Sequence, residues 1–185
     1  MHIRGVNHSG SVSRVISLPR PDGSAWPLTI SPLPLGFHRR LREYGLNPPA
    51  PPVKVSRDSH GKPLRDEQGL AVTTCDNTDP AYLAEVELYH QRVATLAVYH
   101  ALQDDPNITF DTRLNGEPGH PKSRPNSADW LRAADAIHAE LEAAGFTAGD
   151  LILLCEEVCR LSNLIGDHLK AARGNFLSSS PPQAP

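Results

Sequence analysis

The chain has 185 residues, a formal net charge of −3, 39% apolar residues and only 5% aromatic residues. This length suits one domain with appendages, which can bury a core without disulfide bonds. No basic block stands out, which argues against a protein that binds nucleic acid by neutralising phosphates. Three cysteines are an odd number and suit a reducing compartment.

The sequence predicts a cytoplasmic protein with no membrane partner. The amino terminus lacks the long apolar run of a signal peptide. The most apolar run, residues 151–154, is far too short to span a bilayer.

A β-hairpin is predicted near the amino terminus. Residues 12–18 largely alternate between apolar and polar, and residues 25–33 form a second extended stretch with its large apolar residues on one side. The Asp22-Gly23 pair between them is a strong turn signal.

A short amphipathic helix is predicted over residues 35–44. Leu35, Phe37 and Leu41 are its expected packing residues, and Gly45 is the expected residue after its end.

An extended proline-rich and charged segment follows. Residues 48–52 contain four prolines and favour the polyproline II conformation. Residues 53–74 are charged and rich in turn residues, which predicts a linker or a solvated arm. No internal repeat is recognised in the chain.

Three amphipathic helices are predicted in the second half. Asp79 is a good N-cap before Pro80, and that helix is expected to end near residue 104. The second helix is expected to begin at residue 126 or 127 and to stop at Gly145.

The third helix is expected to begin with an approximate capping box, in which Asp150 follows Thr147 by three residues. It is expected to stop near Gly174. The short link after Gly145 makes the last two helices an antiparallel pair.

Apolar residues at helical spacing on these segments are predicted to form the core. They are Leu83, Val86, Val93, Leu96, Trp130, Ile137, Leu141, Leu151, Leu154, Val158, Leu161 and Ile165.

The predicted fold is therefore mainly α with a small N-terminal β-hairpin, an α+β arrangement of about three helices. Its segments are residues 1–47 (hairpin and short helix), 48–78 (extended arm or linker), 79–177 (helical domain) and 178–185 (flexible tail).

No catalytic, cofactor or metal site is predicted. Cys155 and Cys159 lie one helical turn apart but lack further ligands at zinc spacing, so packing is the better interpretation. The nine histidines are dispersed, and no phosphate-binding glycine motif occurs. Asp135 could orient His138 on one helix face, but no activated nucleophile accompanies them.

Two stretches resemble phage tail assembly chaperones. Residues 14–37, with Pro21-Asp22-Gly23 followed by Pro32-Leu33-Pro34-Leu35, resemble the hairpin that opens many of these proteins. Residues 144–164, ending in Leu161-Ser162-Asn163-Leu164, resemble their closing helix. The resemblance implies a non-catalytic assembly factor, without cofactor, that binds the tail tape measure protein and can form multimers.

A protein partner is thus expected to bind through apolar surface on the helical half. The candidate contact residues are Tyr82, Tyr89, Tyr99, Leu164 and Phe176. Self-association through the same surfaces is the nearest alternative. Two other functions stay open, namely a structural component retained in the virion and a small metal-binding enzyme that uses the histidines.

Overall fold

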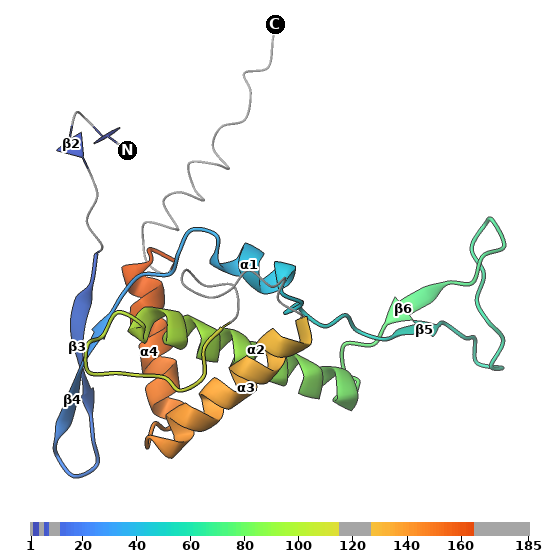
Figure 1. Ribbon diagram of the computed structural model, residues 1–185. Coiled ribbons are helices and arrows are strands. Elements are labelled where there is room, and N and C mark those ends of the chain that lie inside the picture. Colours follow the sequence, from blue (N-terminus) through green and yellow to red (C-terminus); the bar gives the residue numbers. More distant parts are fainter. Residues whose placement is uncertain (1, 4–5, 8–11, 115–126, 165–185) are drawn as a thin grey trace, which may run out of the picture.

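The computed structural model describes residues 2–3, 6–7, 12–114 and 127–164, and it confirms a mainly helical α+β fold with an N-terminal hairpin (Figure 1). Its strands are β1 (His2–Ile3), β2 (Val6–Asn7), β3 (Arg14–Pro19), β4 (Ala25–Ile30), β5 (Val53–Val55) and β6 (Thr73–Cys75). Its helices are α1 (Phe37–Glu43), α2 (Pro80–Leu102), α3 (Ser127–Ala143) and α4 (Ala148–Leu161).

The predicted hairpin is formed by β3 and β4. The two strands pair antiparallel from Arg14 opposite Ile30 to Pro19 opposite Ala25. Gly23 in the connecting turn has a φ of 81°, a left-handed conformation that glycine adopts without steric cost. One face of the hairpin points into the core, where Leu18 and Ile30 are almost fully buried.

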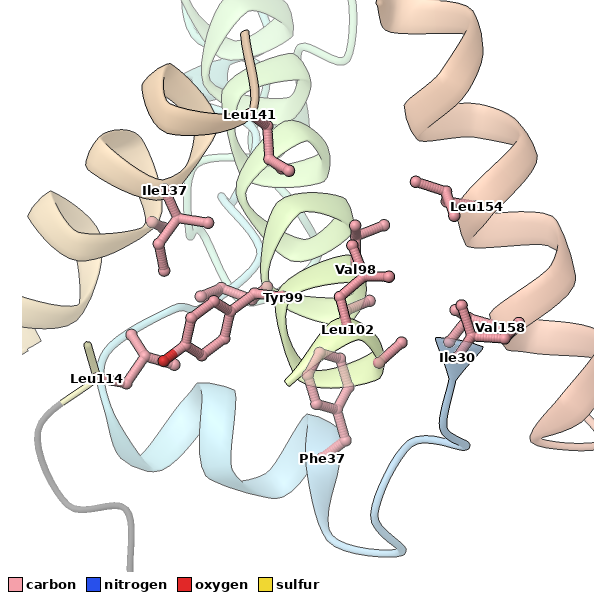
Figure 2. Close-up of a cluster of buried hydrophobic side chains, with 14 of the residues drawn as sticks. Ile30, Phe37, Val98, Tyr99, Leu102, Leu114, Ile137, Leu141, Leu154 and Val158 are labelled. Atoms are coloured by element: carbon pink, nitrogen blue, oxygen red, sulfur yellow. The ribbon is translucent and has the colours of Figure 1, made fainter. Parts of the chain in front are cut away.

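The core lies where α3 and α4 pack against the second half of α2. Figure 2 shows side chains from α3, α4, β4 and α1 converging on Val98 and Leu102 of α2. Residues of the hairpin, α1 and the three long helices belong to one hydrophobic cluster, so these parts form a single body.

Two helices were predicted to begin at a residue whose side chain caps the helix, and the structure confirms both. The carboxylate of Asp79 accepts hydrogen bonds from the backbone N–H groups of Ala81 and Tyr82. Thr147 and Asp150 form a reciprocal capping box at the start of α4. These bonds satisfy N–H groups that a helix leaves without intrahelical partners.

The helices α1, α3 and α4 end with the same geometry. After α1 and after α3, a glycine with positive φ (Gly45 and Gly145) occupies the expected position, and the next N–H donates back across the last turn. α4 ends in the same way at Asn163, whose φ is 56°. The prediction that this helix continues to Gly174 is therefore wrong, because asparagine takes the glycine's role.

The predicted core is largely confirmed, with two errors on α2. Of the predicted set, the buried members are Leu96, Trp130, Ile137, Leu141, Leu154 and Val158, and the members partly buried against them are Val93, Leu151 and Leu161. Leu83 is 50% exposed and Val86 is outside the cluster, because the first turns of α2 extend beyond α3 and α4. Leu35 of the predicted short helix is likewise fully exposed. Ile165 lies outside the described residues.

The end of the hairpin is tied to the end of α2. The buried carboxylate of Asp105 accepts the N–H of Thr29 at 2.6 Å, and the N–H of Ser31 donates to the carbonyl of Ala101. Over the described part of the chain, no helix combines the length and apolar character that crossing a bilayer requires.

Candidate protein-binding surface

Residues 53–75 form a two-stranded arm that begins and ends at the same place. The N–H of Asp76 donates to the carbonyl of Pro52, and β5 then pairs with β6 from Val53 opposite Cys75. Lys54 donates to Asp76 at 2.6 Å, and this bond is the main cause that lowers the pKa of Asp76 to about 2. The segment is thus a paired arm and not a linker.

Beyond β5 and β6, three backbone segments of the arm meet in a closed ring of hydrogen bonds. Ser56 N–H donates to the carbonyl of Val72, Val72 N–H to Leu64, and Leu64 N–H to Ser56, all at 2.8–2.9 Å. These three residues are spaced eight apart in the sequence. The ring joins three segments of the arm without a hydrophobic core.

The two turns of the arm repeat each other. In the first, Asp58 accepts two backbone N–H groups, and Arg57 Nη1 donates to the carbonyl of Gly61. In the second, Asp66 and Arg65 make the equivalent bonds, the latter to Gly69. The sequence interpretation that no repeat exists is wrong, because Arg-Asp-x-x-Gly recurs eight residues apart.

The arm projects from the end of the body where α2 begins (Figure 1). Every residue of 53–75 except Ser56 is exposed. This exposed set includes large apolar side chains, namely Val53 (62%), Val55 (42%), Leu64 (44%), Leu70 (63%) and Val72 (38%). Such side chains on a paired ribbon are a surface that another protein can cover.

A groove lies beside the point where the arm leaves the body. We call it the root groove; its volume is about 460 Å³. It is bounded by residues 45–49, which lie between α1 and the arm, by α2 and by one residue of α3. The lining residues are Gly45, Leu46, Asn47, Pro48, Pro49, Glu85, Leu88, Tyr89, Arg92 and Leu131.

Two contacts fix the walls of the root groove. The ring of Tyr44 stacks on Trp130 with a centroid distance of 4.1 Å, which holds the chain before the arm against α3. Arg92 of α2 makes a bidentate pair with Asp135 of α3, both bonds being 2.7 Å. Asp135 therefore joins two helices, and it does not orient His138 as the sequence had suggested.

The five predicted contact residues differ in their location and exposure. Tyr82 and Tyr89 are half-buried on the exposed end of α2, and Tyr89 lines the root groove. Leu164 is 41% exposed. Tyr99 is 2% exposed and packs against Phe110 in the core, so its assignment as a surface contact is wrong. Phe176 lies outside the described residues.

A larger cavity of about 810 Å³ lies near the end of α2. The guanidinium groups of Arg40 and Arg113 line it, and the carboxylate of Asp104 there accepts a hydrogen bond from the hydroxyl of Ser31. The lining residues are Val12, Ser31, Pro32, Pro34, Arg40, Tyr99, His100, Gln103, Asp104, Ile108, Thr109, Phe110 and Arg113.

The helical cysteines are half-buried thiols. Burial raises the pKa of Cys155 to about 11, and its Sγ lies 3.7 Å from the carbonyl oxygen of Ala94. Burial raises the pKa of Cys159 as well. Over residues 12–114 and 127–164, no three His, Cys, Asp or Glu side chains come together as a metal-binding group.

Comparisons with protein-family models, with curated proteins and with solved structures give no match for this chain. The candidate surface therefore stands on its own geometry. The sequence analysis proposed Tyr82 and Tyr89 as contact residues, which stays a prediction, and it did not consider the apolar side chains of the arm. The eight-residue recurrence of Arg-Asp-x-x-Gly, with Leu64 and Val72 at its ends, was the signal that could have found them.

Proposed function

We propose that this protein is a non-catalytic, protein-binding assembly factor that acts through its arm. The observation that carries the proposal is the arm itself, whose exposed apolar side chains belong to no hydrophobic cluster of the residues that the structure describes. An isolated two-stranded ribbon is only marginally stable in water, so a partner that covers it adds buried apolar area.

The form of the arm favours binding. Its ring of hydrogen bonds and its two glycine turns favour one arrangement of the apolar side chains before a partner arrives. Preorganisation lowers the entropy lost on association. The free edges of β5 and β6 also offer backbone groups that can pair with a strand of another chain.

The resemblance to phage tail assembly chaperones supplies the partner in this proposal, which is the tail tape measure protein. A structural component retained in the virion would use the same arm to bind neighbouring proteins of the particle. The two functions differ in fate, since a chaperone is missing from purified mature particles and a structural component is present in them.

The arm can be removed without opening the body, because Pro52 and Asp76 are joined by a backbone hydrogen bond. We would replace residues 53–75 by a short Gly-Ser linker and co-express this variant with the tape measure protein of the same phage. The wild-type chain should retrieve that protein, and the armless variant should not. The control is Leu35→Glu, which changes an equally apolar and fully exposed side chain outside the arm.

Circular dichroism and thermal unfolding would establish that the armless variant keeps its helical body. Equal retrieval by the wild-type chain and a folded armless variant would show that the arm is not the binding element. If neither retrieves the tape measure protein, the partner assigned by resemblance is wrong.

A further inference from the structure

We propose that the cavity near the end of α2 binds a small organic anion. The carboxylate or phosphate group of this ligand would contact Arg40 and Arg113, and its apolar part would lie against Phe110. The volume of about 810 Å³ falls within the roughly 300–1,000 Å³ that is typical of small-molecule sites. The lining residues lie within 12–40 and 99–113, outside the arm, so this role is independent of the arm.

The cavity has an apolar wall. Its walls come from four segments, namely residues 31–34 after β4, Arg40 of α1, residues 99–104 at the end of α2 and residues 108–113 in the loop after it. The partly buried apolar side chains among them are Pro32, Pro34, Ile108 and Phe110. The ring of Phe110 packs edge-on against Tyr99, with 4.9 Å between the ring centroids, which fixes its position. Small-molecule sites usually combine such a wall with a few polar groups that orient the ligand.

The charged side chains that line the cavity do not neutralise one another. Arg40 and Arg113 are positive and Asp104 is negative, so with His100 counted as neutral the lining has one positive charge in excess. Neither arginine forms an ion pair within the described part of the chain. Oδ2 of Asp104 accepts instead from the hydroxyl of Ser31, at 2.8 Å. Carboxylates and phosphates are the groups that guanidinium ions bind best, which selects an anion as the ligand.

The backbone is fixed on both sides of Arg113. The N–H groups of Asp111 and Thr112 donate to the two carboxylate oxygens of Glu140, at 3.0 and 2.7 Å. Leu114, directly after Arg113, is fully buried in the core (Figure 2). The loop is therefore held against α3 before a ligand arrives, which lowers the entropy lost on binding.

Arg40 also starts from a fixed backbone. Phe37 and Leu41 of α1 are buried in the core, and the exposed side chain of Arg40 lies between them in the sequence. Arg42 of the same helix is exposed as well, and it has no ion pair among the described residues. Since Arg42 does not line the cavity, it provides a matched control for Arg40.

The end of α2 is compatible with an anion nearby. Free carbonyl groups at the C-terminal end of a helix carry partial negative charge and repel anions. Here the carbonyls of Ala101 and Leu102 already accept the N–H groups of Ser31 and Asp105. These two hydrogen bonds reduce the repulsion.

The test titrates the full chain with four probes and follows its backbone amides by nuclear magnetic resonance. Phenyl phosphate and benzoate each combine a ring with an anionic group, inorganic phosphate lacks the ring, and phenol lacks the charge. The variants are Arg40→Gln and Arg113→Gln, and the matched control is Arg42→Gln. Circular dichroism verifies that each variant is folded.

Phenyl phosphate, benzoate or both should bind saturably, with shift changes centred on Gln103 and residues 108–113. The probe that binds more tightly identifies the preferred anionic group as phosphate or carboxylate. Arg40→Gln and Arg113→Gln should each weaken this binding at least about tenfold, as loss of a charge-assisted hydrogen bond does. Arg42→Gln should bind like the wild-type chain.

Four results would overturn the proposal. The first is that neither aromatic anion shifts the amides around the cavity. The second is that phenol binds as tightly as the anions, because the guanidinium groups would then not hold the ligand. The third is that inorganic phosphate binds as tightly as phenyl phosphate, which would remove the role of the apolar wall. The fourth is an equal loss of affinity in Arg42→Gln and Arg40→Gln, which would indicate general attraction to a basic helix.

Discussion

Arg20 and Asp150 form a buried ion pair, with Nη1 and Oδ2 2.7 Å apart and both side chains less than a tenth exposed. The pair joins the turn of the β3–β4 hairpin to the capping box of α4. The guanidinium also lies 3.4 Å over the ring of Trp26. Its Nε and Nη2 find no hydrogen-bond acceptor within the described residues, so its charge is compensated by the Asp150 carboxylate, the Trp26 ring and the Gly145 carbonyl, which also accepts from Nη1.

Replacing Asp150 with asparagine should destabilise the protein by about 3 kcal/mol, because it leaves the Arg20 guanidinium buried without a counter-charge. Urea unfolding measures this change. The matched control is Asp129→Asn, which breaks an exposed pair with Arg132 and should cost less than about 1 kcal/mol. An equal loss of unfolding free energy in the two variants would show that the buried ion pair stabilises the protein no more than the exposed one.

The same carboxylate should make stability depend on pH. Burial by itself would raise the pKa of Asp150, but hydrogen bonds from Thr147 and Arg20 outweigh it and hold the pKa below its usual value. A carboxyl whose pKa is lowered by folding stabilises the native state above its unfolded pKa of about 3.9, and this stabilisation is lost as the pH falls through the folded pKa. The difference in unfolding free energy between wild type and Asp150→Asn should therefore shrink below about pH 4.

Leu154→Ala should cost about 2–5 kcal/mol, because Leu154 is fully buried between α4 and α2. Leu161→Ala should cost less than Leu154→Ala, since Leu161 is only partly buried. Leu83→Ala serves as control on the exposed end of α2 and should cost less than about 1 kcal/mol. A loss as large at Leu83 as at Leu154 would contradict the placement of the core.

Cys75 should react with a thiol reagent at neutral pH much faster than the helical cysteines. It is exposed, whereas burial raises the pKa of Cys155 to about 11 and keeps that thiol protonated. Mass spectrometry over time should show one rapid modification, lost in Cys75→Ser. Rapid modification of two or three thiols, or release of bound zinc, would refute the assignment of Cys155 and Cys159 as packing residues.

Gly69→Ala should loosen the arm without destabilising the body. Gly69 has a φ of 81°, where a Cβ costs about 1–2 kcal/mol, and the arm contributes nothing to the core. Limited proteolysis should cut the variant faster between residues 53 and 75, with an unchanged thermal midpoint for the helices. Gly149→Ala, at a glycine without positive φ in α4, should leave proteolysis of the arm unaltered.

The sequence by itself determined the local structure of this protein. Caps at Asp79 and Thr147 began two helices where expected, and Asp22-Gly23 turned the hairpin, because these features depend on neighbours a few residues away. The end of α4 was missed for a local reason also, since Asn163 adopts a conformation for which glycine is the usual signal.

Only the tertiary structure decided which apolar residues stay outside the core. Leu83 follows the same helical period as Leu96, yet α3 and α4 cover only the second half of α2, so one is half exposed and the other buried. Periodicity reports which face of a helix is apolar, but burial depends on how far its neighbours extend. The arm shows the same limit. Its turns could be predicted from the sequence, whereas the ring joining Ser56, Leu64 and Val72 forms only when three backbone segments eight residues apart meet in space.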